Sequence, residues 1–192
     1  MRGTLMLGLT LVLVSACTSG GTANYPPLTH DFGKVARLEG QAEVARDSGA
    51  RELGPGDAVF VGDDVFVHSG ATLAIVLASG QVVTLSRETR WGIDKAVSNG
   101  AAFGSETSLR SGSFEISGEE YMPHALKIVT PLAEVSTFSE NFRLTLDATE
   151  NKLTAQSLDA TPITPKNAVG ELALEAALEV AVVEGRLPPR IK

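Results

Sequence analysis

The sequence predicts an all-β domain built from short antiparallel strands, in a partly solenoid-like or sandwich-like arrangement. Three observations predict this class. Apolar and polar residues alternate with a period of two in several short runs, as they do on strands with one solvated face. Ser-Gly or Asn-Gly pairs separate these runs, and glycine tolerates the positive φ of tight turns. The most apolar segment, residues 72–85, has such a pair near its centre and predicts a hairpin.

The first seventeen residues form a separate unit. Arg2 gives a positive start, residues 5–14 are apolar, and Val-Ser-Ala-Cys follows, ending at Cys17, the only cysteine. Ten apolar residues are too few for a membrane-spanning helix, which needs about 20, but they suit the central region of a signal peptide. The pattern resembles the signal peptide and lipobox of bacterial lipoproteins. The alternative is a buried N-terminal helix with a cysteine in the core.

This resemblance implies where the protein is held. In bacterial lipoproteins a diacylglyceryl group is attached to the cysteine thiol and the chain is cut just before it, so we expect lipidation at Cys17 and a signal peptide over residues 1–16. Thr18 favours the outer membrane, with the protein facing the periplasm. Residues 17–32 are rich in Gly, Pro, Ser and Thr and would form a flexible tether. The folded domain is expected over residues 33–190.

The hairpin of residues 72–85 is expected at the centre of the domain. A two-residue turn at Ser79-Gly80 would place Leu77 opposite Val82 and Ile75 opposite Thr84. In that register both faces are largely apolar, which predicts cover on both sides. Trp91 would pack near the end of the hairpin.

Later segments alternate more cleanly. Residues 113–117 and 142–147 each place apolar side chains on one face and polar ones on the other. The Ser111-Gly112 pair before the first of them is expected to form a turn. Residues 171–183 alternate strictly, which favours a strand, but their Ala and Glu content leaves a short C-terminal helix as the alternative.

Composition limits the function classes. The 192 residues include 16 Lys and Arg against 23 Asp and Glu, a formal net charge of −7. Such a balance disfavours nucleic acid as a partner, because binding to phosphates requires clustered cations. With Cys17 lipidated, no thiol remains for a disulfide, a zinc site or a nucleophile.

Residues 53–93 carry a more specific pattern. An apolar residue and a Gly-Asp turn (Leu53, Gly56, Asp57) precede a strand over residues 65–70, a strand-Gly-strand hairpin over residues 73–85, and the apolar pair Trp91 and Ile93. This resembles the FecR domain family of bacterial envelope proteins. Residues 33–46 fit the first hairpin of that family, and residues 126–146 fit its later strand pair.

The resemblance implies an all-β, partly solenoid-like domain outside the cytoplasm. In the regulators that name the family, this domain receives a signal from a TonB-dependent outer-membrane transporter. Those regulators also have a cytoplasmic sigma-factor-binding module and a transmembrane helix, and neither is present in this sequence. A Gly-Thr pair that usually precedes the last family strand is replaced here by residues 135–141. The resemblance therefore extends to the β domain and not to the sigma-regulator role.

No catalytic or metal-binding constellation is predicted. Asp57, Asp63, Asp64 and His68 lie close in sequence, but two of the aspartates follow glycines and are typical of turns. No Gly-x-Ser-x-Gly elbow and no phosphate-binding loop occurs. We therefore expect a non-enzymatic protein without a cofactor or metal, and no small-molecule ligand is indicated.

One acidic stretch is a candidate docking rim for a basic partner, with a tyrosine as anchor; its other interpretation is a solvated face. The expected function is recognition of another envelope macromolecule, a protein, as a scaffold or signal relay. The first alternative is a component of a transport-linked signalling system with a separate sigma regulator, and the second is a polysaccharide or peptidoglycan enzyme. The residues of the candidate rim are Glu115, Glu119, Glu120, Tyr121 and Glu134.

Overall fold

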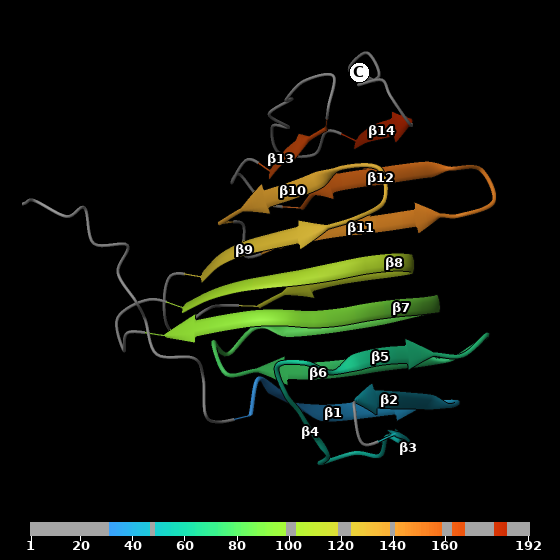
Figure 1. Cartoon of the computed structure of the whole chain (residues 1–192), viewed down its shortest axis with the longest axis vertical. Coiled ribbons are helices and arrows are strands. Elements are labelled where there is room, and N and C mark those ends of the chain that lie inside the picture. Colours follow the sequence, from blue (N-terminus) through green and yellow to red (C-terminus); the bar gives the residue numbers. More distant parts are fainter. Residues whose placement is uncertain are drawn as a thin grey trace, which may run out of the picture.

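The computed structural model describes residues 31–46, 49–98, 103–118, 124–138, 141–158, 163–167 and 179–183. This part of the chain is all-β, as predicted, and contains no helix. Its strands form one connected sheet (Figure 1). In chain order they are β1 (Gly33–Glu39), β2 (Ala42–Arg46), β3 (Gly49–Glu52), β4 (Ala58–Val59), β5 (Asp64–Val67), β6 (Thr72–Leu77), β7 (Val82–Ser98), β8 (Phe103–Ser117), β9 (His124–Val129), β10 (Glu134–Thr137), β11 (Phe142–Asp147), β12 (Lys152–Ser157), β13 (Ile163–Lys166) and β14 (Glu179–Val183).

The sheet is folded into two layers that share its two longest strands. Layer A runs β4, β1, β6, β7, β8, β11, β12 and β14, and uses residues 82–86 of β7 and 112–117 of β8. Layer B runs β3, β2, β5, β7, β8, β9, β10 and β13, and uses residues 90–98 of β7 and 103–111 of β8. Pairing is antiparallel except between β8 and β9. The result is a stack of strands, sandwich-like across and solenoid-like along its length.

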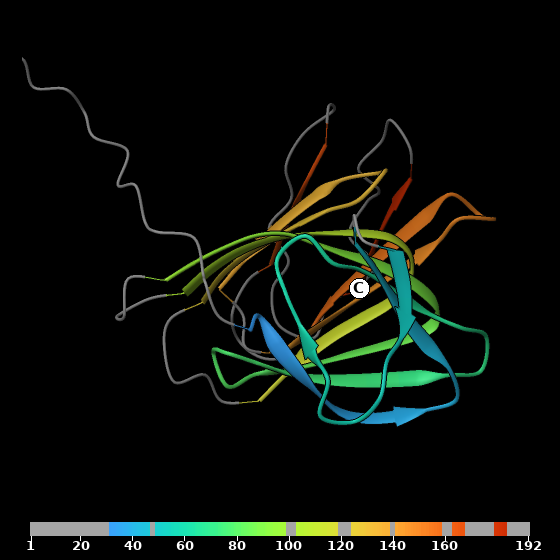
Figure 2. The same cartoon turned by 60° about the horizontal axis from the view of Figure 1, so that its bottom comes forward.

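Four passages of the chain between the layers lie on one side of the molecule, here called the crossing side: at Gly40, at residues 68–71, at Arg87-Glu88 within β7 and at Ser111-Gly112 within β8. On the opposite side, residues 60–63 carry the chain from β4 of layer A to β5 of layer B. Figure 2 shows β7 and β8 curving round from one layer to the other. A turn at Ser111-Gly112 was the wrong prediction, because Gly112 bends a strand that continues to Ser117 instead of ending one.

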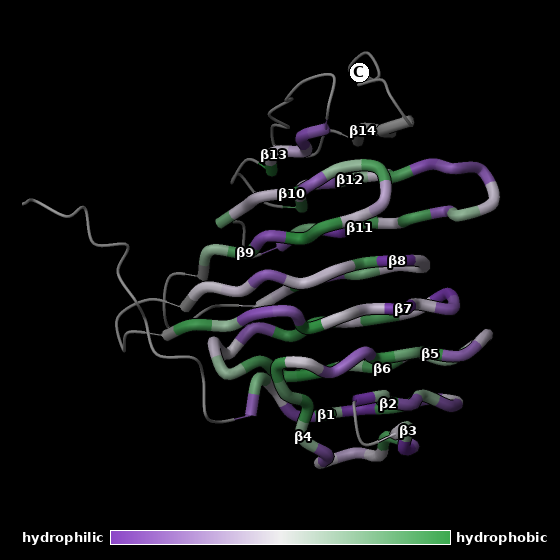
Figure 3. The backbone as a smooth tube through the Cα atoms, viewed as in Figure 1, coloured by the Kyte–Doolittle hydropathy of each residue, from purple (hydrophilic) through white to green (hydrophobic). Residues whose placement is uncertain are grey.

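The core lies between the layers. The buried apolar side chains come from alternating positions of the strands, and Figure 3 shows hydrophobic and hydrophilic residues alternating along the backbone. Four rings cross it in a line: Phe32, Trp91 of layer B, and Phe114 and Phe142 of layer A, with neighbouring ring centres 6.0, 5.8 and 5.9 Å apart. All four side chains are fully buried. Tilted aromatic pairs at this spacing contribute about 0.5–1.5 kcal/mol each beyond the area they bury.

The β6–β7 hairpin forms where it was predicted but in a different register. Val76 lies opposite Val82 and Ile75 opposite Val83, one residue away from the prediction. Three residues, 78–80, connect the strands, and the Leu77 N–H donates to Gln81 O at 2.8 Å. This register gathers the large apolar residues on one buried face, so the expected cover on both sides is also wrong: Val76 is 40% exposed.

Two further expectations have mixed outcomes. Residues 33–46 do not form a hairpin, because β1 pairs with β4 and β6 while β2 pairs with β3 and β5. Gly40 carries the chain across with φ +82°, and a Cβ there would lie 2.7 Å from the Cβ of Ala71. Of residues 171–183, β14 is a strand paired with β12, and residues 171–178 lie outside the described residues.

Candidate functional site

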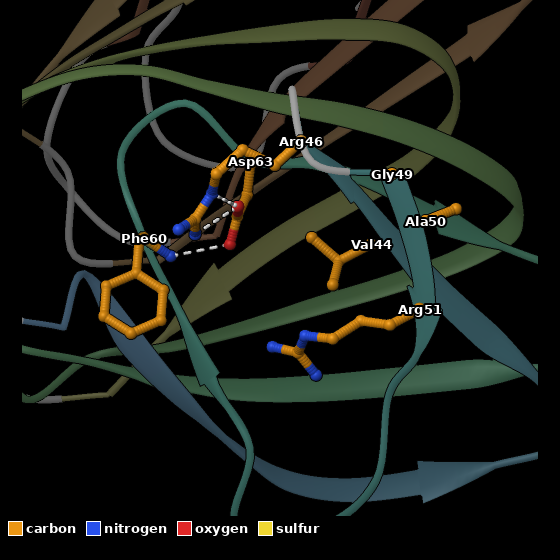
Figure 4. Close-up of a pocket in the computed structure, with 7 residues that line it drawn as sticks. All are labelled: Val44, Arg46, Gly49, Ala50, Arg51, Phe60 and Asp63. Atoms are coloured by element: carbon orange, nitrogen blue, oxygen red, sulfur yellow. Dashed lines mark hydrogen bonds and ion pairs between the residues drawn. The ribbon is translucent and has the colours of Figure 1, made fainter.

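A hollow of about 210 Å³ lies between the β2–β3 hairpin and the loop that follows β4 (Figure 4). The β2–β3 hairpin carries most of its walls, and the loop after β4 supplies an aromatic ring and a carboxylate. These elements stand at the end of the stack where β3 and β4 are the last strands. The lining residues are Val44, Arg46, Gly49, Ala50, Arg51, Phe60 and Asp63.

A buried ion pair fixes one wall of this hollow. The Asp63 side chain is 1% exposed and its Oδ1 accepts a hydrogen bond from Arg46 Nε at 2.6 Å, with a second contact to Nη2. Its Oδ2 accepts from the Phe60 N–H at 2.9 Å. The guanidinium carbon of Arg46 lies 4.8 Å from the centre of the Phe60 ring. Both carboxylate oxygens of Asp63 therefore have partners, and the carboxylate links the Arg46 side chain to the backbone of Phe60.

A second arginine crosses the opposite wall. Arg51 Nη1 lies 3.0 Å from Asp57 Oδ2, and Nη2 donates to Ala58 O at 3.0 Å. Asp57 Oδ2 also accepts from the Gly54 N–H at 2.9 Å and so closes the turn before β4. Arg51 and Asp57 are both about half exposed, and an exposed pair of this kind contributes at most about 1 kcal/mol.

The strand beside the hollow has an open edge. Within the described residues β3 pairs only with β2, and all four of its residues are exposed. Leu53 N donates to Ala42 O at 2.9 Å, which sets the alternation of the antiparallel ladder. By that alternation, the backbone groups of Arg51 face β2, whereas those of Ala50 and Glu52 face outward. The edge therefore presents backbone donors and acceptors beside the hollow.

The aspartates and histidine singled out in the sequence do not gather. Asp64 points to the outer face of layer B, where its Oδ2 accepts from Arg90 Nη2 and from Arg110 Nη1, both at 2.7 Å. The hydrogen bond to Asp64, followed by the negative charge of that carboxylate, raises the pKa of Arg90. His68 packs against Phe66, with ring centres 4.7 Å apart. Within the described residues, no three His, Cys, Asp or Glu side chains come together in a group that could hold a metal ion.

The two described residues of the candidate docking rim, Glu115 and Glu134, are separated. Glu115 lies on the outer face of layer A, where its Oε2 accepts from Arg143 Nε at 2.8 Å. Glu134 lies in β10 of layer B, and its Oε2 is 2.9 Å from Lys127 Nζ. The hydrogen bond to Glu134 raises the pKa of Lys127. These two glutamates face opposite sides of the molecule, while Glu119, Glu120 and Tyr121 lie outside the described residues, as Cys17 does.

Sequence reasoning did not identify Arg46, Arg51 or Phe60. A visible signal was the recurrence of arginine at residues 46 and 51 on either side of a short gap, followed by Asp57 and Asp63. Which arginine meets which aspartate depends on the β2–β3 hairpin closing against the loop after β4.

Comparison with models of known protein families gives no match, and comparison with curated proteins gives none either. Over the part of the chain that the structure describes, no helix has the length and apolar character required to cross a membrane. The geometry of the fold, together with the N-terminal motif, carries the functional argument.

Proposed function

We propose that this chain is a lipid-anchored protein of the bacterial envelope, whose FecR-like β domain binds another envelope protein without catalysing a reaction. The domain acts as a scaffold or signal relay held at the membrane through Cys17. The observation that carries the proposal is the open edge of β3 beside a preformed hollow.

The edge suits strand pairing with a partner. An extended segment of the partner adds to the sheet through backbone hydrogen bonds, and its side chains then enter neighbouring pockets. Ala50 and Glu52 supply the backbone groups, and the hollow beside them offers the Phe60 ring and the guanidinium of Arg51. β3 is short and charged, which limits uncontrolled pairing between copies of the chain.

The state of the carboxylates supports a binding role. Asp57, Asp63 and Asp64 lie on separate turns or faces, and each is in contact with at least one arginine. A glycosidase needs two carboxylates converging across one bond, one of them protonated. The three aspartates do not form that arrangement.

The anchor is supported by the sequence alone. The short apolar run, the small residues before Cys17 and the absence of any other cysteine fit lipidation at that position. Each buried methylene of an acyl chain contributes about 0.8 kcal/mol, so two or three chains give stable attachment. Lipidation is tested by measuring the intact mass of the purified protein and the fraction of the protein that is found in membranes. Both are measured for the natural chain and for Cys17→Ser.

The binding surface is tested by site-specific photocrosslinking in cells. A crosslinking amino acid replaces either Glu52, on the β3 edge, or Glu150, an exposed glutamate of the β11–β12 turn. The proposal expects a discrete crosslinked protein from position 52 and not from position 150. Ala50→Pro, which removes an outward N–H, abolishes that product, while Ala50→Val, which keeps the N–H, does not.

Two outcomes contradict the proposal. One is the same set of products from both positions, which would indicate random neighbours. The other is a position-52 product that survives Ala50→Pro at full yield. Identification of the crosslinked protein as a TonB-dependent receptor would move the role from scaffold to transport-linked signalling.

A further inference from the structure

Arg87 differs from the other arginines of the fold. Seven arginine side chains are described, and six of them form an ion pair with an aspartate or glutamate. Within the same described residues Arg87 has neither an ion pair nor a side-chain hydrogen bond, and it is exposed on the crossing side. A planar guanidinium with five free N–H groups is a ready site for a carboxylate or phosphate.

The backbone at this arginine is unusual. Arg87 has φ +62° and Glu88 has φ +56°, a left-handed conformation that residues with a Cβ rarely adopt. Neighbouring crossings of the chain use glycine at the equivalent points, at Gly40, Gly70 and Gly112. Glycine at residues 87 and 88 would relieve the strain, so the fold itself does not require these side chains. Strain of this kind is typical of functional positions.

Two hollows meet at Arg87. One, of about 170 Å³, lies on the outer face of layer A over β7, β8 and β11. The other, of about 390 Å³, lies on the crossing side and reaches the β11–β12 turn. Arg87 and Thr145 line both hollows. Because they share these two residues, we treat the two hollows as one bent groove, which a chain molecule longer than one unit would follow past Arg87.

The floor of the groove on layer A is made of hydroxyl groups. One row across five neighbouring strands consists only of Ser and Thr, spaced by about 4.8 Å from strand to strand. Ser113 Oγ and Thr145 Oγ1 in this row are 3.4 Å apart. Hydroxyls both donate and accept, so they complement the hydroxyls of a sugar. The row is Thr72, Ser86, Ser113, Thr145 and Thr154.

The lining of the layer A hollow disfavours a protein or nucleic acid as occupant. Protein interfaces depend on buried aromatic and apolar anchors, and this hollow is lined by hydroxyls and charged groups alone. Nucleic acids need several clustered cations, whereas Arg143, the other arginine here, is already paired with Glu115. In this hollow one guanidinium without an ion pair among the described residues lies beside hydroxyls and the Arg143–Glu115 pair, which suits a polyhydroxylated ligand with sparse negative charge. The second hollow adds the Phe66 ring and the carboxylates of Glu88 and Asp147, so the negative charge of the ligand must be confined to the part next to Arg87.

We propose that the groove around Arg87 binds an acidic polysaccharide, with a sugar carboxylate held by the Arg87 guanidinium and sugar hydroxyls held by Ser86, Ser113 and Thr145. The site is separate from the β3 edge, and no bond of the polysaccharide is made or broken. Binding of the ligand thus accounts for an arginine at a position where glycine would relieve the backbone strain.

The experiment is calorimetric titration of the full chain in detergent at low ionic strength. The probes are an oligogalacturonate, a neutral glucose oligomer of the same length, and an oligoglutamate of the same charge. The proposal expects saturable binding of the oligogalacturonate, no binding of the neutral oligomer, and weaker binding of the oligoglutamate.

The variants separate the side chain from the fold. Arg87→Gln lowers affinity for the oligogalacturonate by about tenfold, and Arg87→Gly does the same while raising the thermal midpoint, so misfolding cannot account for the loss. Arg37→Gln, a matched change at an exposed arginine of β1, leaves affinity unchanged. Thr145→Val, which keeps the shape and removes the hydroxyl, lowers affinity by about threefold.

Three results would overturn the inference. The first is the absence of saturable oligogalacturonate binding. The second is equal affinity in Arg87→Gln and the natural chain. The third is oligoglutamate binding as tight as that of the oligogalacturonate and insensitive to Thr145→Val, which would assign the groove to an acidic protein.

Discussion

β7 and β8 run side by side and bend from one layer to the other at the same level, yet they do so with different residues. β8 bends at Gly112, where a Cβ would lie 2.4 Å from the Cα of Thr89. β7 bends at Arg87 and Glu88, both exposed and both left-handed. Packing dictates the glycine on β8, whereas nothing in the packing dictates the arginine and glutamate on β7. The comparison distinguishes a residue that the packing of the fold requires from exposed residues whose side chains are available to a surface.

The β8 bend is the more sensitive of the two. Gly112→Ala adds a Cβ that strikes the Thr89 backbone and imposes a left-handed alanine. The strain costs about 1–2 kcal/mol and the overpacking about 1–3 kcal/mol. We expect the free energy of unfolding to fall by about 3 kcal/mol in urea titration. Gly62→Ala is the control, because Gly62 has φ +91° with no atom within 4 Å of the added Cβ. Equal losses in both variants would show that packing against Thr89 is not the cause.

Thr89 joins the two bends. It is fully buried, and its Oγ1 accepts from the Ser113 N–H at 3.0 Å and also contacts Ser86 O. Thr89→Val keeps the shape and leaves the Ser113 N–H without that partner, so we expect a loss of about 2 kcal/mol in the free energy of unfolding. Thr107→Val is the control, since Thr107 Oγ1 is buried and has no hydrogen-bond partner among the described residues. A control loss as large as the Thr89 loss would remove the special role of the bend.

The β7 bend is expected to respond in the opposite direction. Arg87→Gly relieves a left-handed side chain, worth about 1–2 kcal/mol, against a glycine entropy cost of about 0.5–1 kcal/mol. Chemical denaturation should therefore show a gain of about 0.5–1 kcal/mol in the free energy of unfolding. Arg90→Gly, at a residue of β7 that is not left-handed and is paired with Asp64, should instead lose stability. A loss in Arg87→Gly would mean that the arginine supports the fold after all.

The all-β class was predictable because alternation is local. Residues 142–147 show it: Phe142, Leu144 and Leu146 are buried, while their neighbours are exposed or half-buried, as predicted. The register of residues 72–85 was not predicted correctly, because a Ser-Gly pair marks a turn without fixing how many residues it contains. The alternation itself contained part of the answer, since a connection with an odd number of residues puts Ile75 and Val83 on one face and a two-residue turn does not.

The positions of the sites depended on contacts that no local pattern encodes. Ser111-Gly112 has the same letters as a turn, but its role is set by Thr89, 23 residues earlier. The pairing of Arg46 with Asp63 spans 17 residues and requires the β2–β3 hairpin to be in place. Likewise, the lack of an ion pair at Arg87 among the described residues depends on where the fold places the acidic side chains, which no local pattern encodes.

Because β7 and β8 belong to both layers, layer A and layer B cannot separate as intact units. Detaching one layer would mean breaking two strands in mid-course and exposing the line of rings from Phe32 to Phe142. Partial opening is therefore confined to the ends of the stack, and the centre melts as one cooperative unit. A force applied at one end of the stack is therefore transmitted to the other end, as in a rigid rod and unlike in a hinge.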